Sequence, residues 1–161
     1  MRTLIIFYSL EGSTKKIALK LAQILPAEIL EIKPKKEISK NGFLKFFWGG
    51  KQALMKSCPS LMKWDISLKN FDCIIIGTPV WAFTFSPPIR SFLKEEKIEN
   101  KKVALFCCHE GGMGKTLQNL KEIIGEKNTF IGEKDFRDVR KDDQKALKEA
   151  EDWAMILKKQ L

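Results

Sequence analysis

Hydroxyl side chains cluster where the first apolar run of the chain gives way to a helix-like pattern. This segment consists of Ser9-Leu10-Glu11-Gly12-Ser13-Thr14. Backbone N–H groups at a helix N-terminus, with hydroxyl groups as added donors, form a good site for a phosphate dianion. Helix capping is the simpler interpretation, because Ser and Thr are common N-cap residues. The segment contains no Lys or Arg, so a phosphate here would be held by N–H and O–H donors.

Aromatic residues gather in a second segment, which follows another apolar run where polar loop residues are the norm. Its sequence is Gly77-Thr78-Pro79-Val80-Trp81-Ala82-Phe83-Thr84-Phe85-Ser86-Pro87-Pro88. Trp81 and Phe83 offer flat faces for stacking, and the prolines limit the flexibility of the loop. The pattern indicates a planar ring as ligand. The alternative is that the aromatic side chains form a small core under the loop.

Glycines dominate a third segment, Cys107-Cys108-His109-Glu110-Gly111-Gly112-Met113-Gly114. Glycine lets the backbone approach a ligand closely, so N–H groups here are candidates for contact with ligand carbonyls. His109 is the only histidine of the chain and a candidate proton or redox partner. A lone histidine in a loop is, however, more commonly a surface residue.

Short apolar runs alternate with longer amphipathic stretches, which is the pattern of βαβ units with a parallel sheet. Strands are predicted at Thr3–Tyr8, Glu28–Ile32, Asp72–Gly77, Lys102–Cys107 and Thr129–Phe136. Helices are predicted at Ser13–Leu25, Pro88–Lys94, Gly114–Ile124 and Lys141–Leu161. Ligands of open α/β sheets bind beyond the carboxyl ends of the strands, so the three segments should meet at one edge of the sheet.

In this order and spacing, SLEGST after the first strand, GTPVWAFTFSPPIRSFL after the third and the glycine-rich turn after the fourth resemble the flavodoxin family. The likeness covers essentially the whole chain. It implies an α/β fold with a doubly wound, five-stranded parallel sheet in the order 2-1-3-4-5 and helices on both faces. It also implies that residues 1–161 form one domain of the short-chain group.

The resemblance further implies flavin mononucleotide (FMN) as the cofactor. The first segment is then expected to hold the phosphate, the second to flank the isoalloxazine with Trp81 as the stacking residue, and the third to border the pyrimidine end. The full predicted site comprises Ser9, Leu10, Glu11, Gly12, Ser13, Thr14, Thr78, Pro79, Val80, Trp81, Ala82, Phe83, Cys108, His109, Glu110, Gly111 and Gly112.

The implied function is electron transfer, in which the chain shuttles one or two electrons between redox partners. An FMN-dependent NAD(P)H oxidoreductase of the quinone or azo reductase type is the alternative, because the fold does not determine the reaction. A flavodoxin-like module that has lost its flavin is a further alternative. Gly111-Gly112-Met113-Gly114-Lys115-Thr116 also matches a variant phosphate-binding P-loop, but that interpretation leaves the first two segments without a role.

The 161-residue chain has a formal net charge of +9, and the excess is concentrated in one segment. From Lys33 to Trp64 there are eight lysines and one acid, which gives +7. We interpret this segment, about 33–64, as an enlarged basic crossover that docks an acidic redox partner near the flavin. Flavodoxins are usually acidic, so the segment departs from the family pattern. Its aromatic residues are more simply core, and neither nucleic acid nor a membrane is expected as a partner.

The sequence also bears on the cellular location of the protein and on metal and disulfide sites. No apolar run approaches the roughly 18 residues that span a bilayer. The N-terminal run Leu4–Tyr8 is too short for the core of a signal peptide. A cytoplasmic location is therefore expected. The four cysteines have no CxxC spacing, so neither a metal site nor a disulfide framework is predicted.

Overall fold

A mostly parallel β-sheet forms the centre of the computed structural model, which describes residues 1–37 and 58–161. Parallel pairing joins the strands in the order β2-β1-β3-β5-β6, and β4 pairs antiparallel with β3 off this path. The described strands are β1 (Thr3–Phe7), β2 (Ala27–Glu31), β3 (Cys73–Trp81), β4 (Thr84–Phe85), β5 (Lys102–His109) and β6 (Thr129–Arg137). The five predicted parallel strands are thus present. The described sheet has six strands, since it also contains the two-residue β4, which was not predicted.

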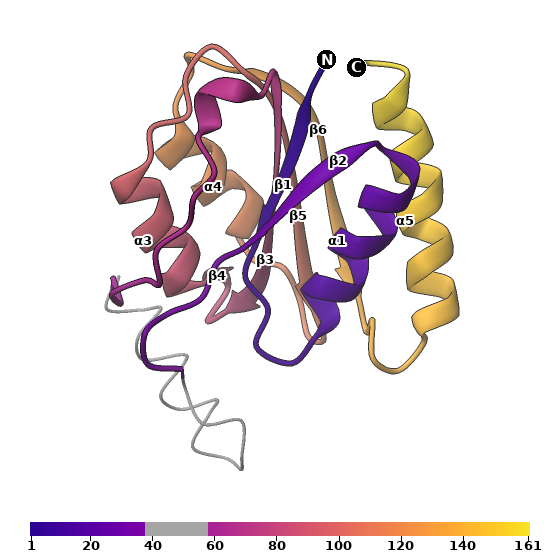
Figure 1. Ribbon diagram of the computed structural model, residues 1–161. Coiled ribbons are helices and arrows are strands. Elements are labelled where there is room, and N and C mark those ends of the chain that lie inside the picture. The colour runs from indigo at the N-terminus through magenta and orange to yellow at the C-terminus, as the bar shows by residue number, and fades with distance from the viewer. Residues whose placement is uncertain (38–57) are drawn as a thin grey trace.

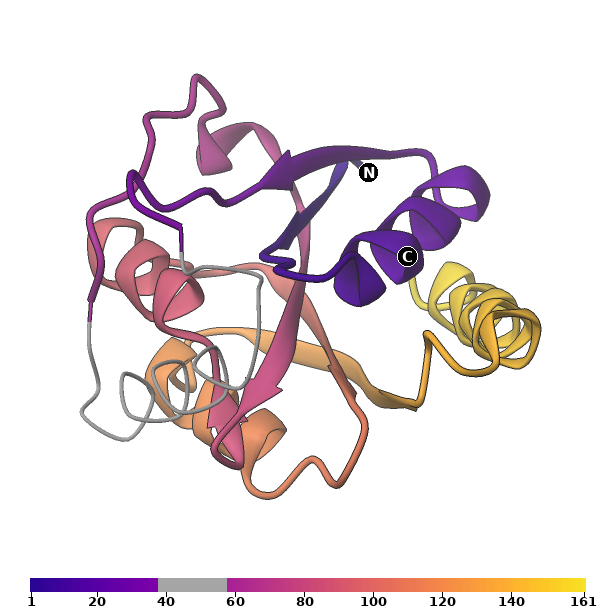
Figure 2. The same cartoon turned by 90° about the horizontal axis from the view of Figure 1, so that it is seen from below.

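Helices cover both faces of this sheet (Figures 1 and 2). Helices α1 (Ser13–Ile24) and α5 (Asp143–Lys158) lie on one face, and α3 (Pro87–Glu95) and α4 (Thr116–Ile124) lie on the other. A short 3-10 helix, η1, spans Leu68–Asn70. No described helix is both long enough and apolar enough to span a bilayer.

Two hydrophobic cores, one on each face, explain why the central strands are apolar throughout. In β1, Leu4 and Ile6 pack in the core with α3 and α4, whereas Ile5 and Phe7 pack in the core with α1 and α5. All five residues of β1 are buried. A strand covered on both faces reads as a continuous apolar run rather than an alternating one, as the sequence indicated.

The third strand is longer than predicted. β3 continues past Gly77 to Trp81, so residues that the sequence assigned to a loop are part of the sheet. The chain then reverses at Ala82 and Phe83, whose φ angles are +49° and +61°, and returns as β4. Two consecutive positive φ angles match the twist that a tight β-hairpin requires, although L-residues adopt them at a cost in strain. The aromatic segment is therefore a strained hairpin.

The two prolines at the end of this segment begin the next helix. A helix was predicted from Pro88, and α3 starts one residue earlier, at Pro87. Proline is favoured in the first helical turn, because its fixed φ suits the helix and its missing N–H has no intrahelical acceptor there. The prolines therefore set the start of α3.

Only the ends of the predicted basic crossover, residues 33–37 and 58–64, lie within the described residues. These ends run antiparallel: Pro34 pairs with Leu61, the Lys35 N–H donates to the Ser60 carbonyl, and the Met62 N–H donates to the Lys33 carbonyl. Both hydrogen bonds measure 2.8 Å. The aromatic residues Phe43, Phe46, Phe47 and Trp48, interpreted above as core, lie outside the described residues.

Candidate functional site

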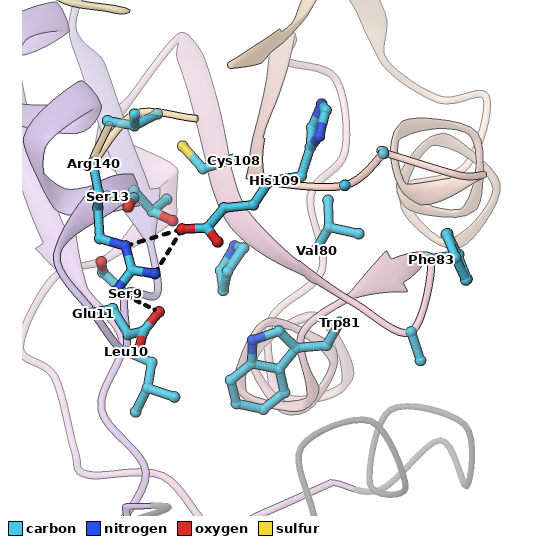
Figure 3. A pocket seen from close by; sticks show the side chains of 17 residues that line it. Ser9, Leu10, Glu11, Ser13, Val80, Trp81, Phe83, Cys108, His109 and Arg140 are labelled. Atoms are coloured by element: carbon cyan, nitrogen blue, oxygen red, sulfur yellow. Dashed lines mark hydrogen bonds and ion pairs between the residues drawn. The ribbon is translucent and has the colours of Figure 1, made fainter. Parts of the chain in front are cut away.

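A pocket of about 320 Å³ opens beyond the carboxyl ends of β1, β3 and β5 (Figure 3). Its walls come from the three segments singled out in the sequence and from the connection between β6 and α5. The lining residues are Ser9, Leu10, Glu11, Ser13, Thr14, Pro79, Val80, Trp81, Ala82, Phe83, Cys108, His109, Glu110, Gly111, Gly112, Val139 and Arg140.

Two predicted site residues, Gly12 and Thr78, do not line this pocket. Gly12 is the N-cap of α1 with φ +94°, and its N–H donates to Ser9 Oγ over 3.1 Å. Thr78 is fully buried. Its hydroxyl oxygen accepts the N–H of Ser86 over 3.0 Å, which fastens the base of the hairpin to the start of α3. Gly12 and Thr78 therefore support the residues that line the pocket without lining it themselves.

The N-terminus of α1 leaves polar groups without partners at the pocket wall. The first intrahelical bond runs from the Lys16 N–H to the Gly12 carbonyl, so the preceding N–H groups of the first turn have no intrahelical acceptor. Among the described residues no side chain caps this helix end, which argues against simple capping. Thr14 Oγ1 is buried near the Cys108 thiol, and no oxygen or nitrogen of the described part of the chain is its hydrogen-bond partner. These donors, together with the positive end of the helix dipole, suit a phosphate.

Trp81 forms the aromatic wall of the pocket. Its ring meets the ring of Tyr8 edge to face, with centroids 5.6 Å apart and planes at 86°. Tyr8 is buried, and its hydroxyl donates to a Glu37 oxygen over 2.7 Å; burial is the main reason why the pKa of Tyr8 is raised. Trp81 thus rests on a side chain that is itself fixed.

The other aromatic residues of the hairpin divide between surface and core. Phe83, at the hairpin tip, is 69% exposed at the pocket rim. Phe85 is buried and lies under the guanidinium of Arg90, whose carbon is 4.2 Å from the ring centroid. The small-core interpretation therefore holds for Phe85, while Trp81 and Phe83 face the pocket.

His109 is not the surface residue that its loop position suggested. It is the last residue of β5, and only 7% of its side chain is exposed. Its Nε2 lies 3.0 Å from Asp135 Oδ2 on β6, and its buried Nδ1 has no hydrogen-bond partner in the part of the chain that the structure describes. The hydrogen bond from His109 is the main reason why the pKa of Asp135 is lowered. His109 therefore joins the ends of two neighbouring strands at the pocket.

The thiol of Cys108 lies in the pocket wall (Figure 3). Burial raises its pKa to about 12. A thiolate is the nucleophile and metal ligand of cysteine chemistry, so a thiol that stays protonated at neutral pH is a poor candidate for either role. Within the described residues no group of three or more His, Cys, Asp and Glu side chains is placed to hold a metal ion.

The P-loop interpretation of residues 111–116 is not supported. A P-loop needs backbone N–H groups and a Thr hydroxyl directed at phosphate and magnesium. Here the Lys115 N–H donates to the Phe83 carbonyl over 3.2 Å, and the Thr116 hydroxyl donates to the Met113 carbonyl over 2.6 Å. Two of the donors that a nucleotide would require are thus engaged inside the protein.

Val139 and Arg140 line the pocket, and neither was predicted from the sequence. Arg140 Nε and Nη2 donate to Glu110 Oε1 over 3.1 and 2.6 Å, and Arg140 Nη1 lies 3.1 Å from Glu11 Oε2. Its hydrogen bond to Glu110 is the main cause of the raised pKa of the guanidinium. The available signal was position: Arg140 follows the last strand, and the carboxyl ends of all parallel strands share one edge of the sheet.

Comparison with known proteins agrees with this fold. The model of the flavodoxin family matches residues 2–150, so the chain belongs to that family. No curated protein matched the chain by sequence.

Solved structures with the same fold include several flavoproteins. A Lactobacillus acidophilus NCFM flavoprotein in complex with FMN is 28% identical, with a TM-score of 0.71, over 89% of this chain and 97% of that one. Oxidised Flavodoxin 2 from Bacillus cereus is 14% identical, with a TM-score of 0.64 and complete coverage of both chains, 100% each. Fusobacterium nucleatum flavodoxin bound to flavin mononucleotide is 16% identical, with a TM-score of 0.59, over 100% of this chain and 99% of that one. The last two likenesses concern the fold alone.

Proposed function

We propose that this chain binds FMN in the pocket at the carboxyl edge of the sheet and carries electrons between redox partners. One observation carries the proposal. Within residues 1–37 and 58–161, no side chain caps the start of α1 and no oxygen or nitrogen binds the buried Thr14 hydroxyl, and this helix end lines the same pocket as the indole of Trp81. A donor-rich corner beside a flat aromatic wall suits a phosphorylated ring compound. FMN is also present in the Lactobacillus acidophilus relative.

In this proposal, different parts of the pocket lining bind different parts of FMN. The N–H groups at the start of α1, with the hydroxyls of Ser13 and Thr14, hold the phosphate in this proposal. Trp81 stacks against the isoalloxazine, and the backbone from Cys108 to Gly112 borders its pyrimidine end. The volume of about 320 Å³ is at the lower end of the range for small-molecule sites, roughly 300–1,000 Å³.

Bound FMN supplies the redox chemistry, because its ring can accept one or two electrons. The protein contributes binding, orientation and electrostatics. Trp81 and Val80 present apolar surface to the pocket and exclude water from that side. His109 is held by Asp135 at the edge of the site, so it keeps the end of β5 in place.

Purified protein is expected to be yellow or to become yellow on addition of FMN. The test is an absorption spectrum followed by mass identification of whatever heat releases. An electron carrier should be reduced only through a reductase protein, because it needs no site for a nicotinamide. Rapid bleaching of bound FMN by NADH or NADPH alone would instead establish the oxidoreductase alternative. A colourless protein that takes up no FMN would contradict both functions.

The partner is proposed to be an acidic redox protein that docks near the flavin and the basic segment 33–64. Lys33, Lys35, Lys36 and Lys63 belong to the described ends of that segment. Opposite charges speed the encounter of two proteins, and added salt screens this attraction. The rate of reduction by an acidic reductase should therefore fall about tenfold or more between low and physiological salt. A rate that does not change with ionic strength would refute this docking mode. The cytoplasmic location and the single-domain organisation are part of the same proposal.

A further inference from the structure

Arg140 is the basic side chain of the pocket wall, and its backbone is firmly placed. The preceding residue, Val139, is only 2% exposed and packs in the core beneath α1 and α5. Asp138 adopts φ +54°, and its N–H donates to the His109 carbonyl at the end of β5 over 2.9 Å. The connection from β6 to α5 is therefore anchored to the sheet, and it delivers Arg140 to the pocket.

The guanidinium of Arg140 bridges two walls of the pocket. It donates twice to Glu110, beyond β5, and pairs once with Glu11, in the segment between β1 and α1. Figure 3 shows it beside Ser9, Glu11 and Ser13. The three side chains are partly exposed, at 43% for Arg140, 27% for Glu11 and 45% for Glu110, so they can exchange partners.

The acidic side chains of the pocket lining would repel a phosphorylated ligand. Among the described lining residues, Glu11 and Glu110 are acidic, and Arg140 is the only Lys or Arg. A phosphate at the start of α1 would lie next to the carboxylate of Glu11, and like charges at close range repel. An arginine held between them can relieve this repulsion, because its planar fork binds phosphate oxygens as well as carboxylates.

We propose that Arg140 is a specificity residue for the phosphate of FMN. Its Nη1 leaves Glu11 and donates to the phosphate, while the two bonds to Glu110 keep the guanidinium oriented. The inference rests on the proposed function, since it concerns the phosphate of the same ligand. Arg140 would thus discriminate FMN from riboflavin, which has the same ring and ribityl chain but no phosphate.

The test is titration of the full chain, freed of flavin, with FMN and with riboflavin in parallel, by flavin fluorescence at low salt. We expect Arg140→Gln to weaken FMN binding about tenfold or more and riboflavin binding less than about twofold, since one charge-assisted bond is lost. Glu11→Gln should strengthen FMN binding severalfold and leave riboflavin unchanged, because it removes the competing carboxylate. Arg140→Lys should keep part of the preference for FMN.

Lys141→Gln is the matched control, because Lys141 is the neighbouring cation, pairs with Asp138 and does not line the pocket. It should leave both affinities unchanged. Equal losses for FMN and riboflavin in Arg140→Gln would overturn the inference, because they would show that Arg140 only holds the two walls together. An unchanged FMN affinity would overturn it as well. Failure of the wild-type chain to bind either flavin would instead overturn the proposed function, and the inference with it.

Discussion

Replacing Gly77 with alanine is expected to lower the free energy of unfolding by about 1–3 kcal/mol, because the new methyl group overlaps a buried aromatic ring. Gly77 lies in β3 directly opposite Phe106 of β5. A Cβ at this position would lie 2.5 and 2.7 Å from the two Cε atoms of Phe106 and would also collide with its Cζ. Real Cβ atoms do not approach other atoms so closely.

The ring of Phe106 has no room to move away. It is fully buried and meets the rings of Phe136 and Trp153 edge to face, with centroids 6.0 and 6.2 Å away. Close packing transmits such an overlap to the neighbours instead of absorbing it. The strain should therefore reach the core between the sheet and α5.

Urea unfolding followed by far-UV circular dichroism measures this loss, and Gly111→Ala is the matched control. Gly111 does not have a positive φ, and a Cβ there would meet no atom of the described residues within 4 Å. Its cost should be below about 0.5 kcal/mol, as for an ordinary surface substitution. The double variant Gly77→Ala/Phe106→Leu should be more stable than the sum of the single variants implies, because the smaller side chain relieves the overlap. A loss at Gly77 no larger than that at Gly111 would show that the core yields.

The strand that contains Gly77 shows why the strands could be predicted from the sequence and their ends could not. Continuous apolar runs indicated β1, β3 and β5, since strands covered on both faces have no polar alternation. The end of β3 was misplaced because Pro79 cannot donate to a sheet and normally marks an edge or an end. The strand nevertheless continues, because Pro79 still pairs in register with Cys108 of β5, and the hairpin to β4 extends the strand beyond it.

The pocket shows a similar division between local and distant signals. The hydroxyl-rich, aromatic and glycine-rich segments were recognisable because each carries its own composition next to a strand. Arg140 carries no such signal, since it is one of several basic residues after β6 and its partners, Glu11 and Glu110, are distant in the sequence. His109 was misjudged for the same reason, because its partner Asp135 is 26 positions away on the neighbouring strand. Pairings of this kind follow from the sheet order and not from local pattern.

Replacing Trp81 with alanine is expected to weaken FMN binding about 30-fold, or about 2 kcal/mol, because the ring loses its aromatic wall. The indole of Trp81 lines the pocket, and its edge contact with Tyr8 fixes its orientation before any ligand arrives. A preoriented ring loses little entropy on binding, so its removal costs affinity in full. Trp81→Phe keeps a flat face and should lose no more than about a third of this free energy.

The measurement is again parallel titration with FMN and riboflavin, and here both affinities should fall by the same factor. Trp64→Ala is the control, because Trp64 packs against Phe92, with ring centroids 5.2 Å apart, and does not line the pocket. That variant should lose stability and keep its affinity for flavin. Equal losses from Trp64→Ala and Trp81→Ala would show that the ring does not stack at Trp81. Trp81→Ala should weaken the binding of both flavins, whereas Arg140→Gln should weaken the binding of FMN alone. This pair of results would place the ring and the phosphate at opposite ends of the pocket.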